Sequence, residues 1–181
     1  PSVTAALDKR KRKLLEIIDA WHGQDLQQVA ISPSTPFSCT PELLAWISKT
    51  AYEHSLAIHV HIGETTWEIN QSLKETGKTP FGYLDSLDFF RQPVNAVHCV
   101  HVTDYDIEIL KERNATVIYC PKSNAKLGSG IAPIPRFLKE GIPVAIATDG
   151  FASNDTNDMF EEMRFGQLIQ KALHEDPQAL A

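Results

Sequence analysis

Short runs of β-forming residues alternate with helical patterns along almost the whole chain, and this alternation constrains the fold more than any other feature. Five runs read as strands, at residues 28–32, 57–61, 94–98, 116–120 and 144–148. Between several of them lie segments in which apolar residues recur with helical spacing or a capping residue opens a helix. Strands separated by helices form βαβ units and pair in parallel, so the sequence predicts an α/β fold.

Capping signals mark the start of two of the expected helices. Thr40 can accept a hydrogen bond from a free backbone N–H, and Pro41 suits the first helical position. Thr103 and Asp106 have the spacing of a capping box for a helix that runs to residue 113. Apolar periodicity predicts further helices at residues 4–21, 135–140 and 157–173.

The chain length leaves two parallel architectures open. Five strands would complete an open doubly wound sheet, whereas a full (β/α)8 barrel needs about 250 residues, more than the 181 present. The first residue is proline rather than methionine, and a helical pattern follows at once. We therefore expect residues 1–181 to form a single partial domain from the middle of a longer protein.

The charge balance and the cysteines restrict the partners and the compartment. Lysine and arginine together number 17 against 23 acidic residues, which gives a net charge of −6 and argues against nucleic acid or an anionic membrane as partner. The 3 cysteines are widely spaced and form no CxxC motif, so a disulfide scaffold or a cysteine zinc cluster is not expected. A reducing cytoplasm is the compartment that this pattern favours.

Histidines and carboxylates collect where the expected strands end. His61 ends the second run, and Glu64 follows three residues later. His98 ends the third run, and Asp149 comes directly after the fifth. In parallel α/β folds the carboxyl ends of the strands carry the working residues. Each residue alone is more often structural, but together they suit a borderline divalent ion such as zinc or iron(II), with Glu64 placed to transfer protons.

Several longer motifs surround these residues. HIGET occupies 61–65, HCVH 98–101, CPKSN 120–124 and TDG 148–150, and further matches lie at 127–130, 153–154 and 159–163. In order and spacing these motifs resemble the amidohydrolase superfamily, and more narrowly its branch of S-adenosylhomocysteine/methylthioadenosine deaminases and triazine chlorohydrolases. The resemblance implies a (β/α)8 barrel of the metal-dependent hydrolase type. This chain would supply about strands 4 to 8, the C-terminal part of that barrel.

The resemblance also implies a role for each strand-end residue. His61 corresponds to a metal ligand, and Asp149 to an aspartate that contacts both the metal and the attacking water. Glu64 matches the glutamate that carries protons, and His98 matches a histidine that assists the water. One divalent metal ion is implied as cofactor, zinc in the first place and iron as the alternative.

The sequence departs from the family pattern at two places. The family's first strand carries a His-x-His pair that binds the same metal, and no such pair precedes the matched segment. His59 and His61 have the right spacing but lie in the wrong motif. Ser34 stands where related deaminases often have a histidine that contacts substrate. Asn124 and Ser153 fall on motif positions to which the resemblance assigns no definite role.

The resulting functional hypothesis is a metal-dependent hydrolase that acts on non-peptide carbon–nitrogen bonds. We expect hydrolytic deamination of an aminopurine-type heterocycle, a small-molecule substrate, by a full-length protein that is a homo-oligomer. A triazine-type chlorohydrolase could use the same residues with chloride as the leaving group. A third possibility is that this chain alone is an inactive fragment, because it lacks the strand-1 metal ligands.

Other conspicuous residues are interpreted as structural. His59 lies one layer deeper than His61 on the same strand face and is expected to be buried and hydrogen-bonded. Cys99 is expected to be a small buried hydrophobic residue and His101 a loop residue. Met159 and Met163 have helical spacing and are expected to pack in the core.

Overall fold

The computed structural model describes the backbone of residues 3–180 and the side chains of residues 6–180, so residues 1, 2 and 181 of the expected domain lie outside it. The strands are β1 (Ala30–Ile31), β2 (Ala57–Ile62), β3 (Val94–His98), β4 (Thr116–Tyr119) and β5 (Val144–Ile146). The α-helices are α1 (Val3–Trp21), α2 (Pro41–His54), α3 (Thr66–Thr76), α4 (Pro80–Asp85), α5 (Asp104–Glu112), α6 (Pro121–Leu127), α7 (Ile134–Lys139), α8 (Phe151–Asn154) and α9 (Met159–His174). Two 3-10 turns of the described chain are η1 (Pro36–Ser38) and η2 (Phe89–Arg91).

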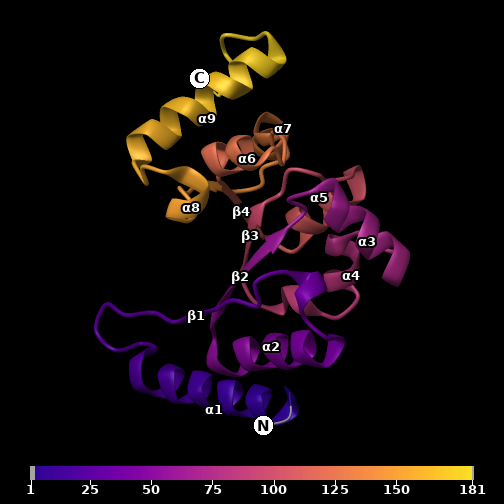
Figure 1. Ribbon diagram of the computed structural model, residues 1–181, viewed down its shortest axis with the longest axis vertical. Helices are drawn as coiled ribbons and strands as arrows, with labels where there is room; N and C mark the ends of the chain where they lie inside the picture. The colour runs from indigo at the N-terminus through magenta and orange to yellow at the C-terminus, as the bar shows by residue number, and fades with distance from the viewer. Residues whose placement is uncertain (1–2, 181) are drawn as a thin grey trace.

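The strands form a single parallel sheet in the order β1-β2-β3-β4-β5. Spatial order therefore equals chain order, whereas a doubly wound sheet reverses direction at a switch point. In Figure 1 the strands follow a curved row, and α2, α3, α4 and α5 lie on the same side of it. Continuous winding with helices outside the sheet is the geometry of a (β/α)8 barrel, and the expected α/β class is confirmed.

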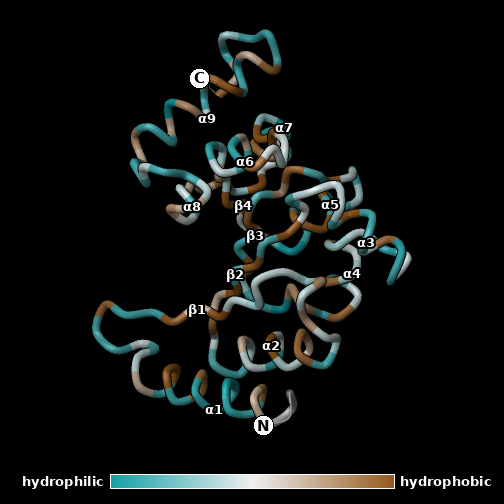
Figure 2. Tube along the Cα trace, viewed as in Figure 1, coloured by the Kyte–Doolittle hydropathy of each residue, from teal (hydrophilic) through white to brown (hydrophobic). Residues whose placement is uncertain are grey.

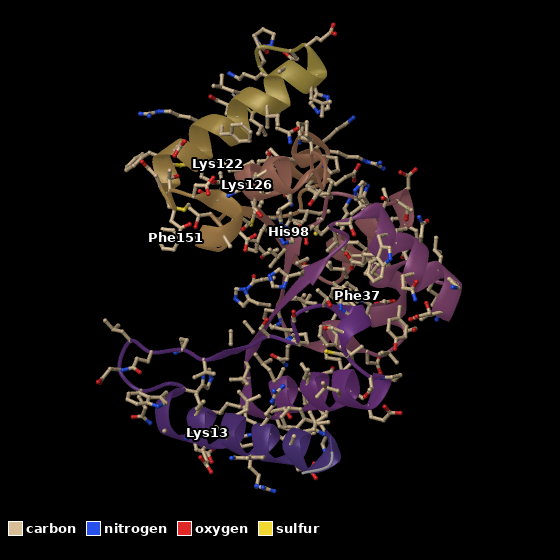
Figure 3. The ribbon with its side chains drawn as sticks, in the orientation of Figure 1. Lys13, Phe37, His98, Lys122, Lys126 and Phe151 are labelled. Carbon is tan, nitrogen blue, oxygen red and sulfur yellow. The ribbon has the colours of Figure 1, made fainter. Side chains whose placement is uncertain are left out.

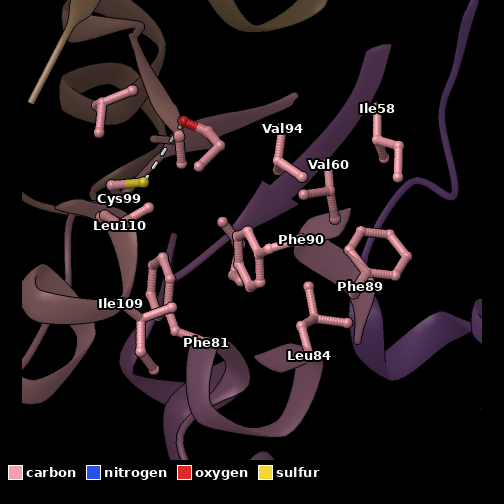
Figure 4. Packing of buried hydrophobic residues seen from close by; sticks show 14 of the residues in the cluster. Ile58, Val60, Phe81, Leu84, Phe89, Phe90, Val94, Cys99, Ile109 and Leu110 are labelled. Atoms are coloured by element: carbon pink, nitrogen blue, oxygen red, sulfur yellow. Dashed lines mark hydrogen bonds between the residues drawn. The ribbon is translucent and has the colours of Figure 1, made fainter. Parts of the chain in front are cut away.

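Alternation along β2 separates a buried face from a more exposed one. Ile58, Val60 and Ile62 are fully buried, whereas His59 and His61 on the other face are accessible. The buried face packs on α4 and η2 through large side chains that include Phe81 (Figure 4). Each such side chain contributes about 1.5–3 kcal/mol by its removal from water. The core therefore lies between the sheet and its helices, and the histidines lie on the opposite, concave side.

Local capping fixes the helices that follow strands. The Thr40 side chain accepts a hydrogen bond from the backbone of Leu43, and Thr103 and Asp106 form the expected capping box. Thr65 caps α3 in the same way, directly after Glu64. The cap therefore begins α3 directly after the segment that carries the candidate site residues His61 and Glu64.

The last helix, α9, turns a polar stripe inward. Its buried residues are Glu162, Gly166 and Gln170, which follow one another at four-residue spacing. Met159 and Met163 are 40% and 43% exposed, so the prediction that they pack in the core is wrong. The apolar residues lie off the buried stripe, because a glycine and two hydrogen-bonding side chains face β4 and α6.

Hydrophobic residues gather along the strands, and polar residues occupy much of the first and last helices (Figure 2). Among the described residues, no helix combines the length and the apolar character that crossing a bilayer requires.

Candidate active site

The ends of β2 and β3 bring three of the expected residues together. The rings of His61 and His98 stack with centroids 5.4 Å apart. Oε2 of Glu64 lies 3.7 Å from Nε2 of His98. In Figure 3 the labelled His98 lies in the middle of the molecule, at the row of strands. Two histidines and one carboxylate therefore share the edge of the sheet that the sequence indicated.

His61 is held by the loop that follows β1. Its backbone N–H and its ring Nδ1 both donate to the carbonyl oxygen of Ser34, at 2.9 Å and 2.8 Å. A histidine that donates from Nδ1 keeps the lone pair of Nε2 free for a metal ion. The backbone of Ser34 has a φ of 64°, a left-handed conformation that places this carbonyl. The orientation of His61 thus suits a metal ligand.

His98 reaches the site because the backbone breaks the alternation of β3. In the parallel register His98 lies beside Ile62, so regular alternation would turn its ring towards the helices. Its φ of 76° and the φ of 49° at Cys99 place both residues in the left-handed region. This conformation is uncommon for residues with a Cβ, and it recurs at functional sites. The ring consequently lies beside His61.

The environment of His98 fixes its protonation state. Nδ2 of the buried Asn124 lies 3.0 Å from Nδ1 of His98; with this amide group as the donor, the ring proton is on Nε2, towards Glu64. Burial lowers the pKa of His98, and the nearby Glu64 carboxylate only partly offsets this effect. The ring is therefore neutral at pH 7 and can donate a hydrogen bond from Nε2.

Glu64 is oriented by a hydroxyl group and by its own loop. Oε1 accepts a hydrogen bond from the Ser129 hydroxyl over 3.1 Å. The backbone N–H groups of Gly63 and Glu64 donate to the carboxylate of Glu68, at 3.1 Å and 2.9 Å. Glu68 is 3% exposed, and burial raises its pKa even though these hydrogen bonds act in the opposite direction. A buried carboxylate thus anchors the loop that carries Glu64.

The loop is also tight at Gly63. Its φ is +64°, and a Cβ added there would lie 2.9 Å from the carbonyl oxygen of His101. Glycine is required on both counts, because other residues disfavour this φ and the space is filled.

Asp149 follows β5 and is held by two hydroxyl groups. Its Oδ2 accepts hydrogen bonds from Ser123 over 2.6 Å and from Ser153 over 2.8 Å. Its φ of 62° is again left-handed. Burial raises the pKa of Asp149, but the two serine hydrogen bonds outweigh it, so this pKa lies below its ordinary value.

The donors present fit part of a metal site. Neutral imidazole and carboxylate are ligands that zinc accepts, and a catalytic zinc ion has three protein ligands and one open position. His61 and Asp149 supply one nitrogen and one oxygen. Among residues 3–180, however, no group of three or more histidine, cysteine, aspartate or glutamate side chains lies close enough together to hold a metal ion. His61 and Asp149 are thus the two candidate ligands that the described residues offer.

The residues interpreted as structural behave as expected with one further exception. Cys99 is fully buried, and Nε2 of His101 bonds the Ser129 carbonyl from a bend in the chain. His59 is hydrogen-bonded, to Nδ2 of Asn95 over 2.8 Å, but it is exposed rather than buried. The burial prediction is wrong because no described segment covers the concave face of β2.

The serine and glutamate residues that hold the site were not singled out from the sequence. Ser123 and Ser129 lie inside the motifs at 120–124 and 127–130, and this position in a motif was the only sequence feature that could have indicated a role in the site. For Glu68 the signal was its position three residues after Thr65, the spacing of a capping box. Asn124, which had no assigned role, orients His98.

Comparison with known proteins identifies the family. The model of the amidohydrolase family matches residues 2–181, and the chain belongs to this family. It is 44% identical over 175 residues to a 5-methylthioadenosine/S-adenosylhomocysteine deaminase of Caldanaerobacter subterraneus subsp. tengcongensis, covering 95% of this chain and 40% of the relative. It is 44% identical over 144 residues to a 5'-deoxyadenosine deaminase of Methanosphaera stadtmanae, covering 80% of this chain and 34% of the relative.

Solved structures agree with the family. An adenosine deaminase of Xanthomonas campestris with bound zinc superimposes with a TM-score of 0.90 at 31% identity, over 96% of this chain and 40% of that one. A guanine deaminase of C. acetobutylicum with bound guanine gives a TM-score of 0.81 at 27% identity, over 90% and 40% of the two chains. An atrazine chlorohydrolase of Arthrobacter aurescens, at 22% identity and a TM-score of 0.85 over 93% and 38%, shows the same fold.

These matches confirm the resemblance and the fold class stated from the sequence: an α/β chain that forms part of a (β/α)8 barrel of the metal-dependent hydrolase type. The chain spans about two fifths of the length of the curated relatives it matches.

Proposed function

We propose that the protein to which this chain belongs is a metal-dependent hydrolase that deaminates an aminopurine-type heterocycle. The observation that carries the proposal is the placement of Glu64 beside the neutral ring of His98, with His61 stacked on the same ring. Relatives at 44% identity bear the names of adenosine-type deaminases, and this supports a purine nucleoside as substrate. Residues 1–181 would contribute one part of the active site as a single partial domain.

The proposed cofactor is one zinc ion, bound by His61 and Asp149 together with ligands from the rest of the protein. When bound, such an ion lowers the pKa of a coordinated water towards neutrality. The bound zinc in a solved relative at 31% identity supports this choice over iron. The hydrogen bond from Nδ1 of His61 to Ser34 presents the other ring nitrogen as the ligand.

Deamination needs a water to add across a carbon–nitrogen double bond and ammonia to leave. Asp149 accepts the proton of the attacking water; its two serine hydrogen bonds keep the carboxylate ionised, so that a proton acceptor is present. Glu64 takes up this proton from Asp149 and delivers it to the ring nitrogen as the oxygen attacks the ring carbon, so that both carboxylates end the cycle ionised. The hydroxyl proton of the adduct then passes to the amino group, which leaves as ammonia while the carbon–oxygen double bond forms.

His98 stabilises the developing negative charge in this scheme. It is neutral and donates from Nε2, so it can provide a hydrogen bond to the oxygen without removing a proton from the attacking water. A fixed donor of this type acts more strongly in a buried site than in water.

The test uses the full-length protein loaded with zinc. Ammonia and chloride release are measured with 5'-methylthioadenosine, S-adenosylhomocysteine, 5'-deoxyadenosine, guanine and atrazine. The proposal expects one ammonia per nucleoside consumed and no chloride from atrazine. Release of chloride from atrazine without release of ammonia from the nucleosides would refute the deaminase proposal and support the chlorohydrolase alternative. The 181-residue chain, assayed alone, is expected to be inactive because it supplies only two of the ligands.

Three further expectations concern the location, the oligomeric state and the partners of the enzyme. A cytoplasmic location is supported by the free cysteines Cys39, Cys99 and Cys120 and is checked by cell fractionation. A homo-oligomeric state of the full-length protein stays a prediction that analytical ultracentrifugation checks. Small nitrogen heterocycles, rather than nucleic acid or membranes, are the proposed partners, in keeping with the acidic net charge of −6.

A further inference from the structure

The buried stripe of α9 contains a carboxylate, Glu162, that has no part in the proposed reaction. Glu162 is 0% exposed. Its Oε1 accepts a hydrogen bond from the backbone N–H of Lys122 over 2.9 Å, and its Oε2 accepts one from Nδ2 of Asn154 over 2.6 Å. In Figure 3 the labelled Lys122 lies between α9 and His98. The carboxylate thus joins the start of α6 to the end of α8.

The two residues that donate to Glu162 are each adjacent in sequence to a serine that donates to Asp149. Lys122 precedes Ser123, and Asn154 follows Ser153; these two serines are the hydroxyl donors to Oδ2 of Asp149. A single carboxylate therefore fixes the segments that carry both donors.

Asn154 adds a third connection, to the backbone of the site. Its Nδ2 also donates to the carbonyl oxygen of Thr148 over 2.7 Å, in the peptide that precedes Asp149. Asn154 is 2% exposed, and its Oδ1 accepts hydrogen bonds from the Asn157 backbone and the Thr156 hydroxyl. Asp149 has a left-handed backbone, a conformation that persists only where the surrounding contacts enforce it.

The approach of α9 depends on a glycine. A Cβ at Gly166 would lie 3.0 Å from side-chain atoms of both Pro121 and Tyr119, so the helix packs here as closely as a glycine allows. Gly166 is one turn after Glu162, and this close approach brings the carboxylate within reach of Lys122. The buried polar stripe of α9 thus holds the start of α6 by a hydrogen bond as well as packing against it.

We propose that Glu162 and Asn154 form a buried clamp that holds Asp149 and its two serine donors in position, which makes Glu162 a positioning residue for the candidate metal site. The inference rests on the proposed function in treating Asp149 as part of the reacting site. Removing a partner behind a metal ligand typically costs 10–100-fold in metal affinity or activity. We expect a loss of about tenfold in each, because Glu162 acts through Ser123 and Asn154 rather than directly.

The experiment compares Glu162→Gln and Asn154→Leu with the control Gln170→Leu in the full-length protein. Glutamine at position 162 has one oxygen, so it can accept only one of the two hydrogen bonds. Its NH2 group would then face the other donor, either the Lys122 N–H or Nδ2 of Asn154. Gln170 is also buried on α9 but bonds Ala132 and Tyr119, away from Asp149. Zinc affinity by chelator competition, kcat and KM for 5'-methylthioadenosine, and the melting temperature are measured for each variant.

The clamp variants are expected to weaken zinc binding and lower kcat about tenfold with KM nearly unchanged. Gln170→Leu is expected to lower the melting temperature but to keep zinc affinity and kcat. Clamp variants that merely melt earlier, with zinc affinity and kcat per zinc-loaded molecule intact, would overturn the clamp. A wild-type protein that binds zinc but releases no ammonia would refute the proposed function alone, since zinc affinity still tests the clamp. A wild type that binds no zinc would overturn both.

Discussion

Replacing Glu64 by glutamine removes the proposed proton carrier and little else. The Glu64 side chain is 24% exposed, and glutamine has nearly the same shape. Its amide oxygen can still accept the hydrogen bond that Ser129 now donates to Oε1 over 3.1 Å. We therefore expect Glu64→Gln to leave the melting temperature of the full-length protein almost unchanged.

The loss in turnover follows from the role of the carboxylate. General acid–base catalysis by one side chain contributes about 10²–10⁴-fold to a rate, or roughly 2.7–5.4 kcal/mol of transition-state stabilisation. An amide cannot carry the proton to the ring nitrogen, so kcat should fall by about 10³-fold. Ser129→Ala removes only the orienting hydrogen bond, worth about 1 kcal/mol, and should lower kcat about fivefold.

The assay is ammonia release from 5'-methylthioadenosine by zinc-loaded protein, with zinc content measured on each sample. Glu53→Gln is the matched control, since Glu53 lies on the surface of α2 paired with Lys49. It should retain full activity. A Glu64→Gln variant whose kcat stays within about twofold of the wild type would refute the assignment of Glu64.

Three further predictions concern stability and reactivity in the full-length protein. Phe81→Ala empties a fully buried position in the core and should lower the free energy of unfolding by about 3–5 kcal/mol, measured by urea titration. Because burial raises the folded-state pKa of Glu68, its contribution to stability is greatest at low pH and is lost as the pH rises through that pKa. The free energy of unfolding of the wild type minus that of Glu68→Gln should therefore decrease from pH 4 to pH 7, and a difference that stays constant would contradict the shift. Burial raises the pKa of Cys120 to about 12, so at pH 8 iodoacetamide should alkylate the partly exposed Cys39 and leave Cys120 unmodified, as mass spectrometry would reveal.

The sequence was sufficient for the strands and for the edge at which the site residues meet. Alternating β-rich runs and helix caps depend on local chemistry, and the capping box of Thr103 and Asp106 formed as expected. His61 and Glu64 could be placed because a strand end and the loop after it are close in sequence. The motifs then gave the family directly.

Backbone conformation could not be predicted from these local signals. His98 lies in the site only because its φ is positive, and strand alternation alone would have directed it towards the helices. The short helix Pro121–Leu127 was missed because a glycine- and serine-rich segment follows it. Helix α3 buries the polar residues Glu68 and Ser72, and α4 has only 6 residues, so tertiary packing of side chains such as Phe81 decides their place.

Burial was the least predictable property. Helical spacing placed Met159 and Met163 in the core, yet the inward face of α9 carries Glu162 and Gln170 instead. Hydrophobic periodicity identifies a face that can be covered, whereas hydrogen-bond partners on other elements decide which face is covered. His59 is exposed for a related reason, since the described chain covers only one side of the sheet.

Zinc content per chain tests the central claim, that the ends of these strands form one metal-dependent site. Elemental mass spectrometry is performed on the full-length protein, on His61→Ala and on the control His59→Ala, which removes a histidine two residues earlier on the same strand face. We predict about one zinc per chain in the wild type and in His59→Ala, and loss of zinc in His61→Ala. Full zinc occupancy in His61→Ala would contradict the assignment of the site.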